Sequence, residues 1–154
     1  IVSCANLNSS IQTVIAGNTD AVSNVCSAAK EAGAKRAITL NVSVPSHCML
    51  MEKPASLFNE FIHNVSITEP STKIIQNFSG DFSNNAELIK SNLVNQLTGS
   101  VKWVEIMKKI KELNLIVIEC GPGKVLQGIG RSNDISDILI SSDENFKSHL
   151  KELI

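Results

Sequence analysis

The sequence has few aromatic residues and almost no charge imbalance. Tyrosine is absent, and aromatic residues make up only 4% of the 154 residues, which weakens any proposal that nucleic-acid bases stack on this protein. The formal net charge is −1, so no broad basic surface is expected to attract nucleic acid or membrane. No apolar run approaches the roughly 20 residues that a membrane-spanning helix needs. We therefore expect neither a nucleic acid nor a membrane as partner.

Cysteine spacing of the kind found in metal sites is also lacking. The four cysteines, Cys4, Cys26, Cys48 and Cys120, are scattered and form neither C-x-x-C pairs nor the usual zinc-ligand spacing. We expect reduced thiols, a cytoplasmic location and no metal ion. The remaining composition, with 43% hydrophobic and 19% charged residues, is typical of a folded globular protein.

The first 44 residues show the pattern of a β-β-α-β block. Strands are expected at residues 1–7 and 13–17, followed by a helix that Thr19-Asp20 caps and Gly33 ends. A third strand is expected at residues 37–44. This order is that of a split βαβ sandwich without its first βα unit, so the sequence is expected to begin inside a domain.

From Pro45 onward, helical and strand-like segments alternate in the order of an α/β protein. The helices each have one apolar face, and the strands are short. The expected helices span residues 54–64, 85–97, 101–113 and 145–154, with a short one from Val125, and the expected strands span 73–78, 115–118 and 135–140. The apolar run at 115–118 is typical of a buried parallel strand.

His47 follows the expected strand at residues 37–44, on a connection that Pro45 stiffens. Open α/β sheets keep reactive groups at such strand ends, and an imidazole exchanges protons near neutral pH. His47 is therefore a candidate general base, with a purely structural histidine as the alternative. A general base needs an acceptor for its second ring N–H, and no carboxylate is close in sequence. The main-chain carbonyl of Gln96, in the last turn of the expected helix 85–97, lacks a partner within that helix and could accept it.

No nucleophile for His47 is evident in the sequence. Cys48 is adjacent, but neighbouring side chains of an extended segment point to opposite faces, so a hydrolase that uses Cys48 and His47 is the weaker hypothesis. No G-x-S-x-G elbow occurs in the sequence. We therefore expect any serine that His47 activates to lie outside this chain.

The turn Gly121-Pro122-Gly123 joins an expected strand to an expected helix. Main-chain N–H groups at such a helix start can bind an anion or a polar acyl group. The turn is not a P-loop, because the spacing G-x-x-x-x-G-K-[ST] is absent. A tight structural turn remains the alternative.

Residues 42–51, VSVPSHCMLM, closely resemble the histidine motif of bacterial malonyl-CoA:acyl carrier protein transacylases. Further matching segments follow in the order of that family, at residues 5–9 with 14–17, 32–36, 95–97 with 101–103, and 119–126. Together they cover nearly the whole chain and correspond to about the C-terminal half of the family's enzyme. The resemblance implies an α/β fold with two parts. Residues 1–44 would form a partial ferredoxin-like small subdomain, and residues 45–154 the C-terminal part of an α/β-hydrolase-like acyltransferase core, a parallel sheet with helices.

The resemblance also implies an activity in fatty acid biosynthesis. In the family, a serine attacks malonyl-CoA, and the acyl-serine then passes malonyl to the phosphopantetheine thiol of the acyl carrier protein. His47 would be the general base, held by the Gln96 main-chain carbonyl. Asn6 and Asn8 would line the cleft between the subdomains, with a structural turn as the alternative role for both. No cofactor is implied beyond these two substrates. The serine, the oxyanion hole and the carboxylate-binding arginine belong to the N-terminal half, so that half is an expected partner and the chain alone is expected to be inactive.

Departures from the family pattern leave two alternatives open. The family commonly has Asn-Ser-Pro-Gly-Gln where this chain has Asn-Ser-Ser-Ile-Gln at residues 8–12, and Ser46 before the histidine is not a clean malonyl marker. One alternative is a polyketide-synthase-type acyltransferase with another acyl specificity. The other is a non-catalytic docking fragment in which Lys35, Arg36 and Lys124 meet an acidic carrier protein.

Overall fold

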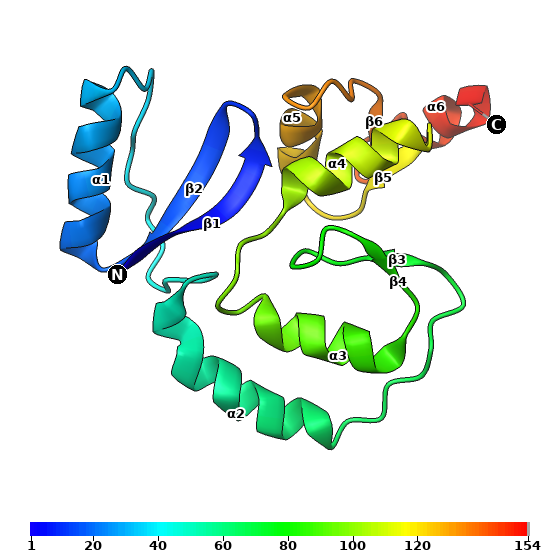
Figure 1. The fold of residues 1–154 in the computed structure, drawn as a ribbon. Coiled ribbons are helices and arrows are strands. Elements are labelled where there is room, and N and C mark those ends of the chain that lie inside the picture. Colours follow the sequence, from blue (N-terminus) through cyan, green and yellow to red (C-terminus); the bar gives the residue numbers. More distant parts are fainter. Residues whose placement is uncertain (154) are drawn as a thin grey trace.

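A computed structural model describes residues 1–153 and shows a mixed α/β fold (Figure 1). Strand β1 (Val2–Ser9) pairs antiparallel with β2 (Gln12–Gly17), and helix α1 (Thr19–Glu31) packs against β2. The predicted hairpin and helix are therefore present. The predicted cap is wrong by one residue, because Asn18 occupies the N-cap position and its side chain makes no capping hydrogen bond.

The strand predicted at residues 37–44 does not form. This segment is irregular, and Ile38, Leu40, Val42 and Val44 alternate along it with at least half of each side chain exposed. A strand requires a neighbouring backbone to hydrogen-bond with, and no strand within residues 1–153 pairs with this segment. Apolar alternation indicates which face a segment can bury, but it does not supply a partner. The division of the chain near residue 44 stays a prediction.

Two helices lie side by side in the middle of the chain (Figure 1). They are α2 (Glu52–His63), which follows a 3₁₀ turn at Met49–Met51, and α3 (Ala86–Asn95). Between them in sequence lies a small antiparallel hairpin of β3 (Ile74–Ile75) and β4 (Phe82–Ser83). The strand expected at residues 73–78 is therefore shorter than predicted, and β4 was not predicted.

The C-terminal part alternates helices with one parallel strand pair. The helices are α4 (Trp103–Glu112), α5 (Val125–Arg131) and α6 (Phe146–Leu153), and the parallel strands are β5 (Val117–Glu119) and β6 (Ile138–Ile140). The parallel direction was predicted correctly, whereas the predicted burial was wrong. Leu115, Ile116 and Ile118 are all exposed, because no second sheet neighbour or covering helix within residues 1–153 reaches them. The predicted end of the last helix, Ile154, lies outside the described residues.

The connection from α3 to α4 runs beside β1 and is hydrogen-bonded to it. Val101 accepts a main-chain hydrogen bond from Leu7 at 2.9 Å and donates one to Ala5 at 2.8 Å, so it continues the hairpin beside β1. The Ser100 hydroxyl donates to the Cys4 carbonyl at 2.5 Å. Helix α4 then packs on β1 through its buried face, which includes Ile106 and Met107. The end of α3 is therefore tied directly to the first strand.

Among residues 1–153, no helix combines the length and the apolar composition that crossing a membrane would need. None of the four cysteines is disulfide-bonded within the part of the chain that the structure describes. No group of three His, Cys, Asp or Glu side chains in this part of the chain is arranged to hold a metal ion.

Candidate active site

His47 is fixed to the C-terminal end of α3 by two hydrogen bonds. Its main-chain N–H donates to the Leu97 carbonyl at 3.1 Å, and its ring Nδ1 lies 2.6 Å from the Gln96 main-chain oxygen. Gln96 is the C-cap of α3, so its carbonyl belongs to the last turn, where the helix supplies no N–H partner. Because a carbonyl can only accept, Nδ1 carries a proton, and in the neutral ring the lone pair therefore lies on Nε2. This is the tautomer that a general base requires.

The backbone at His47 adopts a conformation that few residues other than glycine use. Its φ angle is +62°, in the left-handed region, which costs of order 1–3 kcal/mol for a residue with a side chain. The two hydrogen bonds to the end of α3 hold the residue there. Such conformations persist where the surrounding structure determines them, and they cluster at functional sites.

Although Cys48 is adjacent to His47, its thiol is buried and engaged in a hydrogen bond. Its side chain is completely buried, and its thiol lies 3.2 Å from the Pro45 carbonyl, to which it donates. The His47 ring, by contrast, is half-buried and reaches the Gln96 carbonyl. A buried thiol engaged with a carbonyl is not presented to a substrate, so the geometry argues against a nucleophilic Cys48.

Asn6 and Asn8 lie on β1 and are both half-buried. Asn6 forms a parallel bridge with Val101, whereas the Asn8 side chain donates to the Gln12 side chain at 2.9 Å across the hairpin. The Asn8 carbonyl also accepts from the Asn133 side chain at 2.8 Å. No hydrogen bond within residues 1–153 joins either asparagine to the His47 ring. Their place in a substrate cleft stays a prediction.

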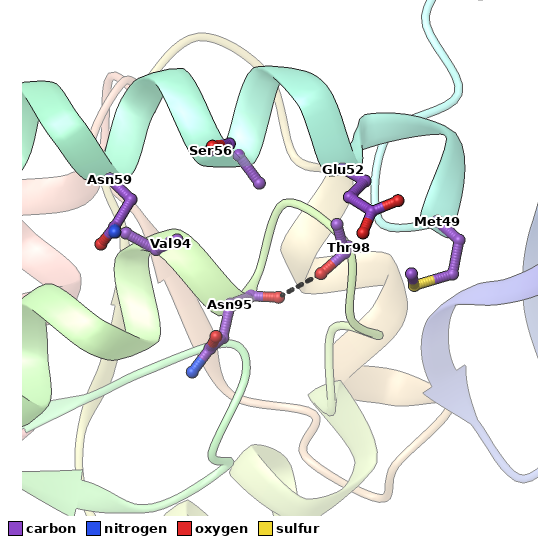
Figure 2. Close-up of a pocket in the computed structure, with 8 residues that line it drawn as sticks. Met49, Glu52, Ser56, Asn59, Val94, Asn95 and Thr98 are labelled. Atoms are coloured by element: carbon purple, nitrogen blue, oxygen red, sulfur yellow. Dashed lines mark hydrogen bonds between the residues drawn. The ribbon is translucent and has the colours of Figure 1, made fainter.

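A groove of about 390 Å³ lies between α2 and α3 (Figure 2). Figure 2 shows side chains from both helices around it, and the Thr98 hydroxyl directed at the Asn95 main-chain oxygen, 3.5 Å away. Neither His47 nor Gln96 lines this groove, whose residues are Met49, Glu52, Ala55, Ser56, Asn59, Val94, Asn95 and Thr98. The groove is therefore separate from the reactive atoms of His47.

The start of α5 is capped by a carboxylate from the same chain. Glu119, which is only 9% exposed, accepts hydrogen bonds from the main-chain N–H groups of Leu126 at 3.0 Å and Gln127 at 2.9 Å. Gly121 and Gly123 have φ angles of +142° and +93° and make the sharp turn that brings the carboxylate to the helix start. An incoming anion would meet a negative charge there. The structure therefore supports the tight-turn interpretation and not the anion site.

Two buried amides near α3 were not predicted from the sequence. Asn92 is 5% exposed and Gln76 is 8% exposed, and their side chains are hydrogen-bonded to each other at 2.8 Å. A signal was present in the sequence, since Asn92 follows Ile89 by three positions and so falls on the apolar face of the expected helix. An asparagine on such a face needs a buried partner.

Comparison with known proteins gives a consistent result. No protein-family model matches the chain. The chain is 37% identical over 151 residues to the malonyl CoA-acyl carrier protein transacylase of Haemophilus influenzae, covering 96% of this chain and 48% of that protein. The solved structure of the malonyl CoA-acyl carrier protein transacylase from Coxiella burnetii superposes with a TM-score of 0.90 and 40% identity, covering 99% of this chain and 48% of that one.

A second solved structure adds a partner of the relative. It is a malonyl-transacylase in complex with a type II polyketide-synthase acyl-carrier protein, with a TM-score of 0.93 and 35% identity, covering 99% of this chain and 50% of that one. This chain thus spans about half the length of the proteins it matches. By sequence and by fold, the chain is similar to about half the length of malonyl CoA-acyl carrier protein transacylases, and this half-length match fits the C-terminal portion that the sequence motifs predict.

Proposed function

We propose that this chain supplies the general base of a malonyl-CoA:acyl carrier protein transacylase in fatty acid biosynthesis. The observation that carries the proposal is the 2.6 Å contact between His47 Nδ1 and the Gln96 main-chain oxygen, which leaves Nε2 as the proton acceptor. An uncharged acceptor fixes the ring without placing a carboxylate beside a substrate that is itself an anion. The names of the relatives support malonyl as the acyl group.

The proposed reaction has two half-reactions that share one proton acceptor. His47 Nε2 takes the proton from a serine hydroxyl supplied by the N-terminal half, the serine oxygen bonds to the thioester carbon, and the bond from that carbon to the CoA sulfur breaks. The imidazolium then returns the proton to the CoA thiolate. In the second half-reaction, Nε2 takes the proton from the carrier-protein thiol, whose sulfur displaces the serine oxygen. The proton then returns to that oxygen.

Two partners follow from this proposal. The first is the N-terminal half of the same enzyme, which would also cover apolar side chains that are now exposed, such as Ile38, Val42, Leu115 and Ile116. The second is a phosphopantetheinylated acyl carrier protein, supported by the complex that a relative forms. The free thiols favour a cytoplasmic location. Lys35, Arg36 and Lys124 are exposed, but no observation favours a purely non-catalytic docking role for them.

The test is His47→Ala in the complete enzyme, with His63→Ala as the matched control. His63 is an exposed histidine at the end of α2, so its loss should leave the transfer rate unchanged. Loss of the general base should lower malonyl transfer to the carrier protein about 10²–10⁴-fold, with acyl-enzyme formation slowed as well. Near-normal transfer by a folded His47→Ala protein would contradict the proposal. Parallel assays with malonyl-CoA and methylmalonyl-CoA would distinguish the malonyl enzyme from a polyketide-type acyltransferase.

A further inference from the structure

A pair of buried amides connects the β3–β4 hairpin to the middle of α3. The Asn92 Nδ2 group donates to Gln76 Oε1 at 2.8 Å, and the Gln76 Nε2 group donates to the main-chain oxygen of Ile89 at 3.1 Å. Gln76 thus uses both ends of its amide on the same turn of α3. Both side chains are more than 90% buried, so an unmade bond would leave a polar group without water. The arrangement is directional in a way that apolar packing is not.

The residues that follow Gln76 continue this contact to the helix end. The Asn77 side-chain amide donates to the Gln96 side-chain oxygen at 3.4 Å. The main-chain carbonyl of Asn77 accepts a hydrogen bond from the Lys102 main-chain N–H at 2.9 Å. Phe78 packs against Gly99 so closely that a methyl group at Gly99 would lie 2.5 Å from a ring carbon. The tripeptide 76–78 therefore contacts α3 itself, its C-cap residue Gln96, and the residues that follow the helix.

The helix transmits the position of the amide pair to the catalytic contact. The Asn92 carbonyl accepts the Gln96 N–H at 3.0 Å, so Asn92 and Gln96 are successive turns of one hydrogen-bond ladder. If α3 slid by one residue along its axis relative to the β3–β4 hairpin, both hydrogen bonds of the Gln76 side chain would break. The Gln96 carbonyl would move by about 1.5 Å relative to the hairpin. The distance from that carbonyl to His47 Nδ1 changes by a similar amount where residues 45–51 keep their place and do not follow the helix end, and the Nδ1 signal measures this directly.

We propose that Gln76 and Asn92 are positioning residues, which hold α3 in the one register that places the Gln96 carbonyl on His47 Nδ1. They touch neither substrate nor reacting atoms, and they act through the helix end. The consequence for catalysis rests on the function proposed above for His47, whereas the effect on the ring does not. Displacement of a catalytic group by about 1 Å can cost about 10²-fold in rate, so the amide pair should affect kcat far more than KM.

The experiment is a double-mutant cycle in the complete enzyme, with Gln76→Met, Asn92→Leu and the double variant. Both substitutions keep the approximate shape and remove the amide. The readouts are the ¹⁵N NMR signal of His47 Nδ1, which reports its hydrogen bond, and kcat and KM for malonyl transfer. We expect each single variant to shift the Nδ1 signal and lower kcat about 10-fold to 100-fold with KM little changed. The double variant should be no worse than either single variant, because the two residues act as one unit.

Asn95→Leu is the matched control, because Asn95 is an exposed asparagine three positions further along α3. It should change neither readout. Circular dichroism identifies the variants that remain folded. Asn92→Gln keeps the amide, so its Nδ1 signal should lie closer to that of the unmodified protein than the signal of Asn92→Leu does. An unchanged Nδ1 signal in folded Gln76→Met overturns the positioning role. A shifted Nδ1 signal with normal kcat supports the positioning role and counts instead against His47 as the base.

Discussion

Glu119 offers the sharpest test of the local architecture, because one side chain satisfies two main-chain groups. Glu119→Ala removes the acceptor for the N–H groups of Leu126 and Gln127. Loss of a cap at a helix start typically costs about 1 kcal/mol, and loss of a negative charge there adds about 0.3–1 kcal/mol. Leu126 is itself exposed, so water replaces part of what is lost. We expect Glu119→Ala to lower the free energy of unfolding by about 1–2 kcal/mol, and Glu119→Gln, which keeps one acceptor oxygen, by about half of that.

Urea unfolding and amide hydrogen exchange measure this effect at two scales. With a denaturant dependence of about 2 kcal/mol per molar, in the middle of the usual range, the Ala variant should unfold at a midpoint lower by about 0.5–1 M urea. The amides of Leu126 and Gln127 should exchange faster in the same variant, since they lose their acceptor. Glu144→Ala, at an exposed glutamate, is the control. Equal midpoints and equal exchange at the two amides in Glu119→Ala and the unmodified protein would refute the capping argument.

Two further predictions concern the segments next to α3 and α4. Gly99→Ala should lower the free energy of unfolding by about 1–3 kcal/mol, because its methyl group would fall 2.5 Å from a Phe78 ring carbon. Gly128→Ala is the control, because a methyl group there meets open space. Thermal unfolding compares the stability of the two variants. The hydrogen bond with Lys109 lowers the pKa of Asp81 and raises the pKa of Lys109. The pair therefore stabilises the fold at pH values between the lowered pKa of Asp81 and the raised pKa of Lys109. Within that range, Asp81→Asn should lower the free energy of unfolding by a small amount. Urea unfolding should show that this loss vanishes in acid below the lowered pKa of Asp81, and also with added salt.

The sequence predicted the site better than the sheet. A proline-stiffened histidine without a nearby carboxylate made the free carbonyls of a helix end possible acceptors, and the resemblance to the transacylase family singled out Gln96, whose contact the structure contains. The local part of that argument used the proton chemistry of imidazole and the free carbonyls of a helix terminus, and the choice among helix ends came from the resemblance. The roles of His47 and Gln96 in catalysis stay predictions, as do those of Asn6 and Asn8.

The failures share a different cause, because each depended on a partner distant in sequence. The segment 37–44 has the alternation of a strand but no neighbour in the described chain, and the run 115–118 is apolar but exposed. The start of α5 had the chemistry of an anion site, but Glu119 already occupies it. Periodicity and turn chemistry show what a segment can do. Which partner it meets depends on tertiary contacts that one sequence does not display.

Gln96 shows why a main-chain contact can be invisible at its own position. Its contribution to the site is a main-chain carbonyl, and every residue has one. What the sequence must specify is that α3 ends at this residue, in this register, beside a histidine with a left-handed backbone. That information lies at other positions, in Gly99 after the helix and in the buried amides of Gln76 and Asn92. The residues that determine a main-chain contact are therefore those that fix the helix around it.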